Sequence, residues 1–117
     1  MRFVILVLLA LPLAAASDIS GKWLIEGDVT GYPVILNCSF EQKADAKIVG
    51  KCTAKGGEGT ETLDISGAAD GEKFKFSFTT SSGYTLEYTG TLQGDTIKGD
   101  IAVAGVTGTF TGKRSAE

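Results

Sequence analysis

The sequence predicts an all-β fold, an eight-stranded antiparallel up-and-down barrel, and three observations favour it. Apolar and polar residues alternate with period two from Trp23 to Arg114, as they do where one face of a sheet is buried and the other is wetted. Short turns rich in Gly and Asp separate the alternating segments, and none of these segments has a helical period. Because no amphipathic helix is available to cover the apolar face, we expect the sheet to close on itself, which buries that face and leaves no free edge.

The strands are expected, in chain order, near residues 20–28, 33–43, 47–54, 61–68, 72–80, 84–93, 95–103 and 106–114. Between them lie turns whose residue types accept positive φ or form Asx turns, among them Asp70-Gly71, Ser82-Gly83, Gly94-Asp95 and Ala104-Gly105. Connections this short make each strand the antiparallel neighbour of the next.

The alternation also assigns an inward face to each strand. In order, the inward residues are Trp23 and Ile25; Val34, Leu36, Cys38 and Phe40; Ile48, Gly50, Cys52 and Ala54; Leu63 and Ile65; Phe74, Phe76 and Phe78; Tyr84, Leu86, Tyr88 and Leu92; Ile97, Gly99, Ile101 and Val103; and Val106, Gly108 and Phe110. The inward glycines at 50, 90, 99, 108 and 112 are expected to let strands bend sharply or to leave room for aromatic rings.

The first residues have the pattern of an export signal. Arg2 supplies a positive charge, an apolar run follows from Phe3 to Leu13, and Ala14-Ala15-Ala16 fits a cleavage site. The apolar run is short for a membrane span. We therefore expect residues 1–16 to be a signal peptide and residues 17–117 to form a single β-barrel domain, periplasmic or secreted and without stable membrane insertion.

Cys38 and Cys52 are the only cysteines, and they lie at equal distances from Asp45 on consecutive expected strands. If the turn is centred on Asp45, the two residues sit directly opposite each other, where an S–S bond can form. In an exported chain a disulfide is the expected state. It would close a loop of roughly 15 residues and contribute about 3 kcal/mol in the chain-entropy model.

The two ends of the expected barrel differ. At the end that holds the termini the connections are tight, near 43–46, 69–71 and 93–95; at the opposite end, called here the distal end, longer connections are expected at 28–32, 55–60 and 80–83. Trp23 and Arg114 are expected to close the termini end. Smaller side chains toward the distal end form the candidate ligand-binding set, which comprises Tyr32, Val34, Leu36, Phe78, Tyr84, Leu86, Val103 and Val106. A barrel filled completely by its own side chains is the alternative.

The chain lacks the residues of most catalytic and metal sites. It has no His, so the usual general base near neutral pH and the commonest transition-metal ligand are missing. Both cysteines are expected to be oxidised, which removes thiolate chemistry. We therefore expect no enzymatic activity, no cofactor and no metal. A net charge of −3 without a basic run also argues against nucleic-acid partners.

Gly21-Lys22-Trp23 resembles the G-x-W motif on the first strand of the calycin superfamily, which contains lipocalins, fatty-acid-binding proteins and avidins. Arg114 closes the last strand with inward parity, where that superfamily stacks a cationic side chain across the Trp. The resemblance implies a calycin-like barrel over the whole mature chain. Because Trp23 is the only Trp and Leu24-Ile25 offers no hydrogen bond, a biotin site of the avidin kind is not expected.

A second resemblance concerns Ile19-Ser20-Gly21-Lys22-Trp23-Leu24, which is similar to the start of periplasmic metalloprotease inhibitors. That resemblance implies an N-terminal trunk that enters a protease, here reduced to residues 17–20. Ser81-Ser82-Gly83-Tyr84 resembles a loop of periplasmic lysozyme inhibitors. The sequence thus predicts a non-enzymatic exported barrel that binds a small, largely apolar molecule at its distal end. A partner-binding or inhibitor role through loops or the N-terminus is the alternative, and the identity of the ligand, the oligomeric state and the host stay open.

Overall fold

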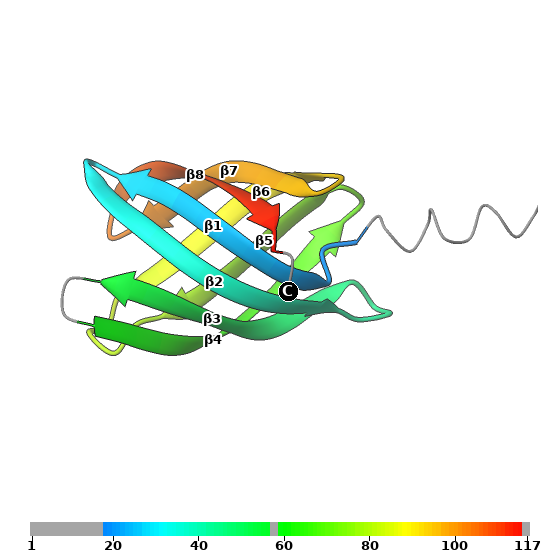
Figure 1. Cartoon of the computed structure of the whole chain (residues 1–117), viewed down its shortest axis with the longest axis horizontal. Coiled ribbons are helices and arrows are strands. Elements are labelled where there is room, and N and C mark those ends of the chain that lie inside the picture. Colours follow the sequence, from blue (N-terminus) through cyan, green and yellow to red (C-terminus); the bar gives the residue numbers. More distant parts are fainter. Residues whose placement is uncertain (1–17, 57–58, 116–117) are drawn as a thin grey trace, which may run out of the picture.

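The computed structural model describes residues 18–56 and 59–115, which form one closed antiparallel barrel. Each strand pairs with the next and β8 pairs with β1, as Figure 1 shows. The strands are β1 (Gly21–Val29), β2 (Tyr32–Gln42), β3 (Lys47–Gly56), β4 (Gly59–Asp70), β5 (Lys73–Thr79), β6 (Thr85–Gln93), β7 (Thr96–Val103) and β8 (Val106–Arg114). The predicted eight-stranded meander is confirmed. The expected signal peptide, residues 1–16, lies outside the described residues.

The register of the strands sets the shape of the barrel. Following paired residues around all eight ladders returns to β1 about ten residues from the starting point, and a stagger of this kind tilts the strands and fixes the bore of an eight-stranded barrel. An interior of this size is either filled by side chains or holds one small ligand.

The core lies along the barrel axis and follows the predicted parity. Every strand contributes side chains to one cluster of buried residues, and Trp23, Ile25, Leu36, Tyr88 and Ile101 are among the most deeply buried. Charged side chains are absent from the buried set over residues 18–56 and 59–115. The alternation of apolar and polar residues is therefore the alternation between lumen and solvent.

Glycines bend the wall where strands pass close to one another. A Cβ on Gly99 would collide with the carbonyl oxygen of Thr89 on β6, and a Cβ on Gly90 would lie 3.0 Å from the Cζ atoms of both Phe74 and Phe110. The first glycine therefore permits a close approach of two strands, and the second leaves room for two rings. The room for aromatic rings at Gly90 was predicted from the inward parity of the glycines.

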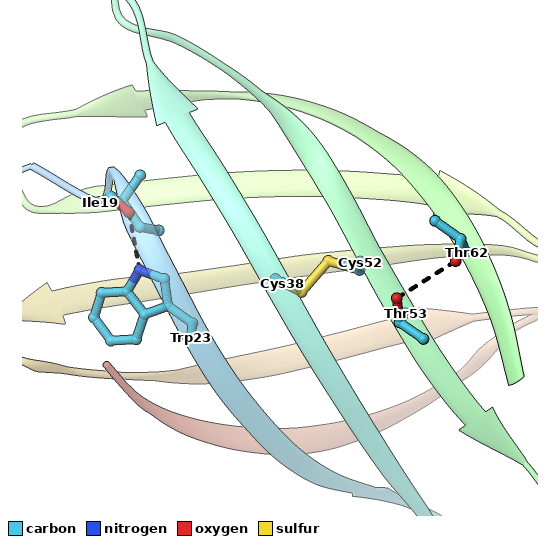
Figure 2. Close-up of a disulfide and its surroundings, with 6 residues drawn as sticks. All are labelled: Ile19, Trp23, Cys38, Cys52, Thr53 and Thr62. Carbon is cyan, nitrogen blue, oxygen red and sulfur yellow. Dashed lines mark hydrogen bonds between the residues drawn. A yellow bond between two sulfur atoms is a disulfide. The ribbon is translucent and has the colours of Figure 1, made fainter. Parts of the chain in front are cut away.

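The predicted disulfide joins Cys38 on β2 to Cys52 on β3, as Figure 2 shows. The two residues are paired across the β2–β3 ladder with their Cα atoms 4.0 Å apart, a spacing that fits a non-hydrogen-bonded pair. On the other side of β2, Cys38 pairs with Trp23. The bridge therefore fixes the register of the strands next to the start of the barrel.

Two expectations about the distal connections require correction. The connection expected over 28–32 is a turn of Thr30 and Gly31, with φ of 51° and 92°, and Asp28 Oδ1 accepts a hydrogen bond from Gly31 N at 2.8 Å. Two positive φ values match the twist of a hairpin and allow the strands to run on to the turn. The loop expected over 55–60 is shorter, since β3 ends at Gly56 and β4 begins at Gly59; residues 57–58 lie outside the described residues.

Candidate ligand-binding site at the distal end

Trp23 and Arg114, the residues expected to close the termini end, lie in contact there. The indole of Trp23 is buried, and the guanidinium carbon of Arg114 lies 4.5 Å from the centroid of its ring. Trp23 Nε1 donates a hydrogen bond to the carbonyl oxygen of Ile19 at 2.9 Å (Figure 2). A cation above an indole is stabilising, and more so when it is shielded from water.

The segment before β1 completes this closure. Arg114 Nη1 donates to the carbonyl oxygen of Ser20, and its Nη2 donates to that of Asp18, both at 2.7 Å. Ile19 is buried, and its N–H donates to Gln42 Oε1 at 3.2 Å. Residues 18–20 therefore lie against the barrel and are held by β1, β2 and β8. The resemblance to protease inhibitors implied a trunk over residues 17–20, and within the described part, from residue 18 onward, this segment is tied down.

Aromatic rings occupy the middle of the lumen. Tyr88 on β6 stacks on Phe76 of β5 with centroids 4.8 Å apart and an interplanar angle of 7°, and its ring lies 5.1 Å from that of Phe110 on β8. Phe76 in turn lies 5.0 Å from Phe40 of β2. The contact between Phe40 and Phe76 crosses the lumen from β2 to β5, so the rings form a floor in the middle of the barrel.

The hydroxyl of Tyr88 is the exception in this floor. Tyr88 is 0% exposed, and its Oη is the one buried side-chain polar atom without a hydrogen-bond partner among residues 18–56 and 59–115. Desolvation by burial raises the pKa of Tyr88 above its ordinary value of 10.0, so the phenol stays protonated and can donate. An unpaired buried hydroxyl is costly, which makes this atom a feature that requires an explanation.

The predicted ligand-binding set divides into three layers at the distal end. Leu36 and Phe78 are buried, Phe78 beside Tyr88 of the aromatic floor, and Val34, Leu86 and Val103 are half-buried nearer the distal ends of their strands. Tyr32, Tyr84 and Val106 were expected to line the lumen, but they are 74%, 56% and 42% exposed. Tyr32 and Val106 are the first residues of their strands and Tyr84 precedes β6, so their inward parity places them at the rim, not inside the wall.

Ladder pairing brings most of this set together. Leu36 pairs with Ala54, Phe78 with Leu86 and Val103 with Val106. The first pair belongs to β2 and β3, whereas the others belong to β5–β8, on the opposite side of the closed ring. The lining is therefore apolar, with aliphatic side chains and Phe78 on opposite sides of the distal half, a composition typical of sites for small apolar molecules.

Glu61 is a residue of this end that the sequence analysis did not single out. It shares the parity of Leu63 and Ile65, pairs with Ala54 and is half-buried. Its Oε2 accepts a hydrogen bond from the backbone N–H of Ser81 at 2.8 Å. The connection from Thr80 to Tyr84 is also held by its own hydrogen bonds, from Thr80 N to Tyr84 O and from Gly83 N to Thr80 O. Period-two parity with Leu63 was the signal that could have found Glu61.

The outer wall carries a shallow depression over β6 and β7. A shallow groove of about 510 Å³ runs over Gly90 and Gly99 on β6 and β7. It is bordered by solvent-facing threonines and charged residues, namely Lys73, Thr89, Thr91, Lys98, Asp100, Thr109 and Thr111. Lys98 and Asp100 interrupt the rows of threonines, so this face has no continuous hydroxyl array, and polar side chains of this kind are usual on a wetted sheet.

The described residues contain neither a metal-holding group of side chains nor a membrane-spanning helix. Over residues 18–56 and 59–115, no group of three or more His, Cys, Asp or Glu side chains is placed to hold a metal ion. In the same part of the chain, no helix has the length and apolar character needed to cross a membrane.

Comparisons with known proteins address the fold. The chain matches no protein-family model and no curated protein. It is similar to a de novo designed fluorescence-activating β-barrel, with a TM-score of 0.72 and 14% identity over 86% of this chain and 97% of that one. A redesigned β-barrel gives a TM-score of 0.72 with 17% identity over 86% of this chain and 95% of its own. A third barrel, mFAP2b bound to DFHBI, gives a TM-score of 0.66 at 13% identity over 87% and 96% of the two chains. These neighbours support an eight-stranded antiparallel barrel.

Proposed function

We propose that this protein is a non-enzymatic binding barrel that takes up a small, largely apolar molecule at its distal end. The main support for this proposal is that one end of the lumen is closed by hydrogen bonds and the other is lined by half-buried apolar side chains. Arg114, Trp23 and residues 18–20 close one end with hydrogen bonds, whereas the other end has half-buried Val34, Leu86 and Val103 beneath an exposed rim. Sites for small molecules are concave and mostly apolar, and barrel mouths are among their usual places.

Two further observations support the proposal. The solved barrels that resemble this one include two bound to DFHBI, a small dye, so barrels of this overall shape can be built to hold one small molecule. The Trp23–Arg114 contact agrees with the arrangement that the calycin resemblance implies. We extend the proposal to a calycin-type barrel that is exported to the periplasm or secreted, in keeping with the disulfide and the apolar N-terminal segment.

A pair of neighbouring substitutions tests the site. Val34 and Ile35 are adjacent on β2, with Val34 half-buried in the lumen and Ile35 exposed on the outer wall. Val34→Phe should fill part of the distal lumen and weaken binding of a neutral naphthalene probe at least tenfold. Ile35→Phe adds a similar bulk outside the lumen and should leave binding unchanged. Titration by fluorescence or calorimetry measures both, and circular dichroism checks that each variant is folded.

The outcomes of this test separate the proposal from its rival. Saturable binding that only Val34→Phe weakens supports a site inside the distal end. Absence of saturable binding to the unsubstituted protein, or equal losses in the two variants, would contradict it.

A second candidate, a protein partner bound by the distal rim, has one specific observation in its favour. Tyr32 and Tyr84 are exposed beside turns, and exposed tyrosines are enriched in protein interfaces. In that case Tyr32→Ser with Tyr84→Ser should abolish capture of the partner from the host's own extract, while binding of the naphthalene probe stays within a factor of about two.

A further inference from the structure

The unpaired hydroxyl of Tyr88 is a buried polar atom among the apolar side chains of the lumen. From it we infer that the ligand is a neutral, largely aromatic or aliphatic molecule with a carbonyl-type acceptor, which accepts a hydrogen bond from Tyr88 Oη. This inference rests on the proposed function and deepens it. It adds the chemical class of the ligand and a binding residue outside the set expected from the sequence.

The position of the Tyr88 ring supports such a contact. The ring stacks on Phe76 of the adjacent β5 and also contacts Phe110 of β8, two strands away in the other direction. A ring that reaches both neighbours extends into the lumen from the wall. Phe78, which belongs to the distal lining, lies 5.7 Å from Tyr88 between ring centroids. Tyr88 and Phe78 thus belong to one cluster of rings, on which a molecule entering from the distal end would rest.

The state of the hydroxyl defines its partner. Burial disfavours the phenolate, so Tyr88 carries its proton and needs an acceptor. Leaving a buried hydroxyl unpaired costs free energy that a ligand acceptor would recover on binding. A site that presents such a group discriminates strongly between ligands with and without the matching atom.

The charge of the lumen limits the acceptor further. Buried cationic side chains are absent from residues 18–56 and 59–115, and Glu61 lies half-buried at the distal end, with its carboxylate committed to Ser81 N. An anionic ligand would be desolvated without a countercharge. A ketone, aldehyde, ester or amide oxygen fits Tyr88 Oη better than a carboxylate.

Matched probes test this class. 2-Acetylnaphthalene and 2-ethylnaphthalene have the same ring system and nearly the same size, and they differ in one carbonyl oxygen. Dissociation constants of both are measured with the unsubstituted protein and with Tyr88→Phe, which removes one oxygen and keeps the ring contacts. The dissociation constant of 2-acetylnaphthalene divided by that of 2-ethylnaphthalene should be about tenfold higher in Tyr88→Phe than in the unsubstituted protein. Comparing this ratio between the two proteins cancels the difference in hydration of the two probes.

A control variant and a direct readout complete the experiment. Tyr84→Phe removes a hydroxyl from the exposed rim and should leave the ratio unchanged. In the complex with the unsubstituted protein, the infrared carbonyl stretch of 2-acetylnaphthalene should lie at lower wavenumber than in the Tyr88→Phe complex, as expected for a hydrogen-bonded carbonyl. 2-Naphthoate should bind more weakly than 2-acetylnaphthalene.

The failure of this inference is distinguishable from that of the proposed function. If neither naphthalene binds to the unsubstituted protein, both are overturned. If both probes bind at the distal end but the ratio and the carbonyl stretch are the same in Tyr88→Phe, the proposed function stands and the role of Tyr88 is overturned. A water molecule paired with Tyr88 Oη would produce that second result.

Discussion

The two ends of the barrel are built from the same alternating strands, but they use their polar groups differently. At the termini end, the inward polar groups are hydrogen-bonded, since Arg114 and Trp23 together donate to three backbone carbonyls of residues 18–20. At the distal end, the inward side chains are mainly aliphatic, and the nearest buried polar atom, Tyr88 Oη, is unpaired. Because the closure at the termini end stabilises the barrel, the side chains of the distal end can contact a ligand without loss of the fold.

The largest expected effect is at the centre of the closure. Trp23→Ala would remove a fully buried indole, its hydrogen bond to Ile19 and the surface on which Arg114 lies. We expect a loss of about 3–5 kcal/mol in the free energy of unfolding, measured by urea denaturation. A loss below about 1 kcal/mol would mean that the closure contributes little to stability.

Arg114→Lys should have the next largest effect, about 2 kcal/mol, because hydrogen bonds from charged groups contribute more than neutral ones. An ammonium group keeps the charge but cannot lie over the indole and reach the carbonyls of Asp18 and Ser20 with a planar fork. Asp95→Asn is the matched control. The Asp95 carboxylate bonds to Arg114 Nε from an exposed position, so its loss should cost at most about 1 kcal/mol. Equal losses of unfolding free energy in the two variants would show that Arg114 stabilises the barrel through the surface ion pair and not through its hydrogen bonds to residues 18–20.

An alkaline titration examines the floor between the two ends. Because burial raises the pKa of Tyr88, the folded barrel keeps this phenol protonated, while the unfolded chain ionises it near 10.0. The contribution of the protonated Tyr88 to the free energy of unfolding is therefore fully present below pH 10. Above pH 10 the free energy of unfolding should decline by up to about 1.4 kcal/mol per pH unit. Tyr88→Phe should remove this part of the decline. Identical pH profiles for the two proteins would argue that Tyr88 ionises freely in the fold.

The smallest effects are expected at the rim. Tyr32→Ser and Val106→Ser change exposed side chains at the beginning of strands and should alter the free energy of unfolding by no more than about 0.5 kcal/mol. Thermal unfolding of both variants beside Trp23→Ala measures the contrast directly. Losses above about 2 kcal/mol at the rim would contradict the division into a stabilising end and a binding end.

Much of the fold could be predicted because side-chain parity is a local property of a strand. The alternation placed all eight strands within a few residues of their observed bounds, and the symmetric spacing of Cys38 and Cys52 about Asp45 predicted their pairing. Glycine parity predicted the room for aromatic rings at Gly90.

The position of a residue along the barrel axis depends on contacts between distant parts of the chain. The sequence therefore predicted it less well than it predicted the side-chain parity. Tyr32, Tyr84 and Val106 have inward parity, but at a strand end parity no longer ensures burial. The burial of Ile19 depends on residues 18–20 turning back under the barrel, where Gln42 and Arg114 bind them. The unpaired state of Tyr88 Oη depends on all the rings around it at once, and no single pattern in the sequence reports that.

The most direct test of a closed and a binding end is a chemical-shift map of the ¹⁵N-labelled protein titrated with 2-acetylnaphthalene. We predict saturable shifts at the amides of Val34, Ala54, Leu86 and Val103 and at the Tyr88 floor, with the indole N–H of Trp23 unchanged. Shifts centred on Trp23 or on the outer wall, or no saturable shifts at all, would contradict a site in the distal lumen.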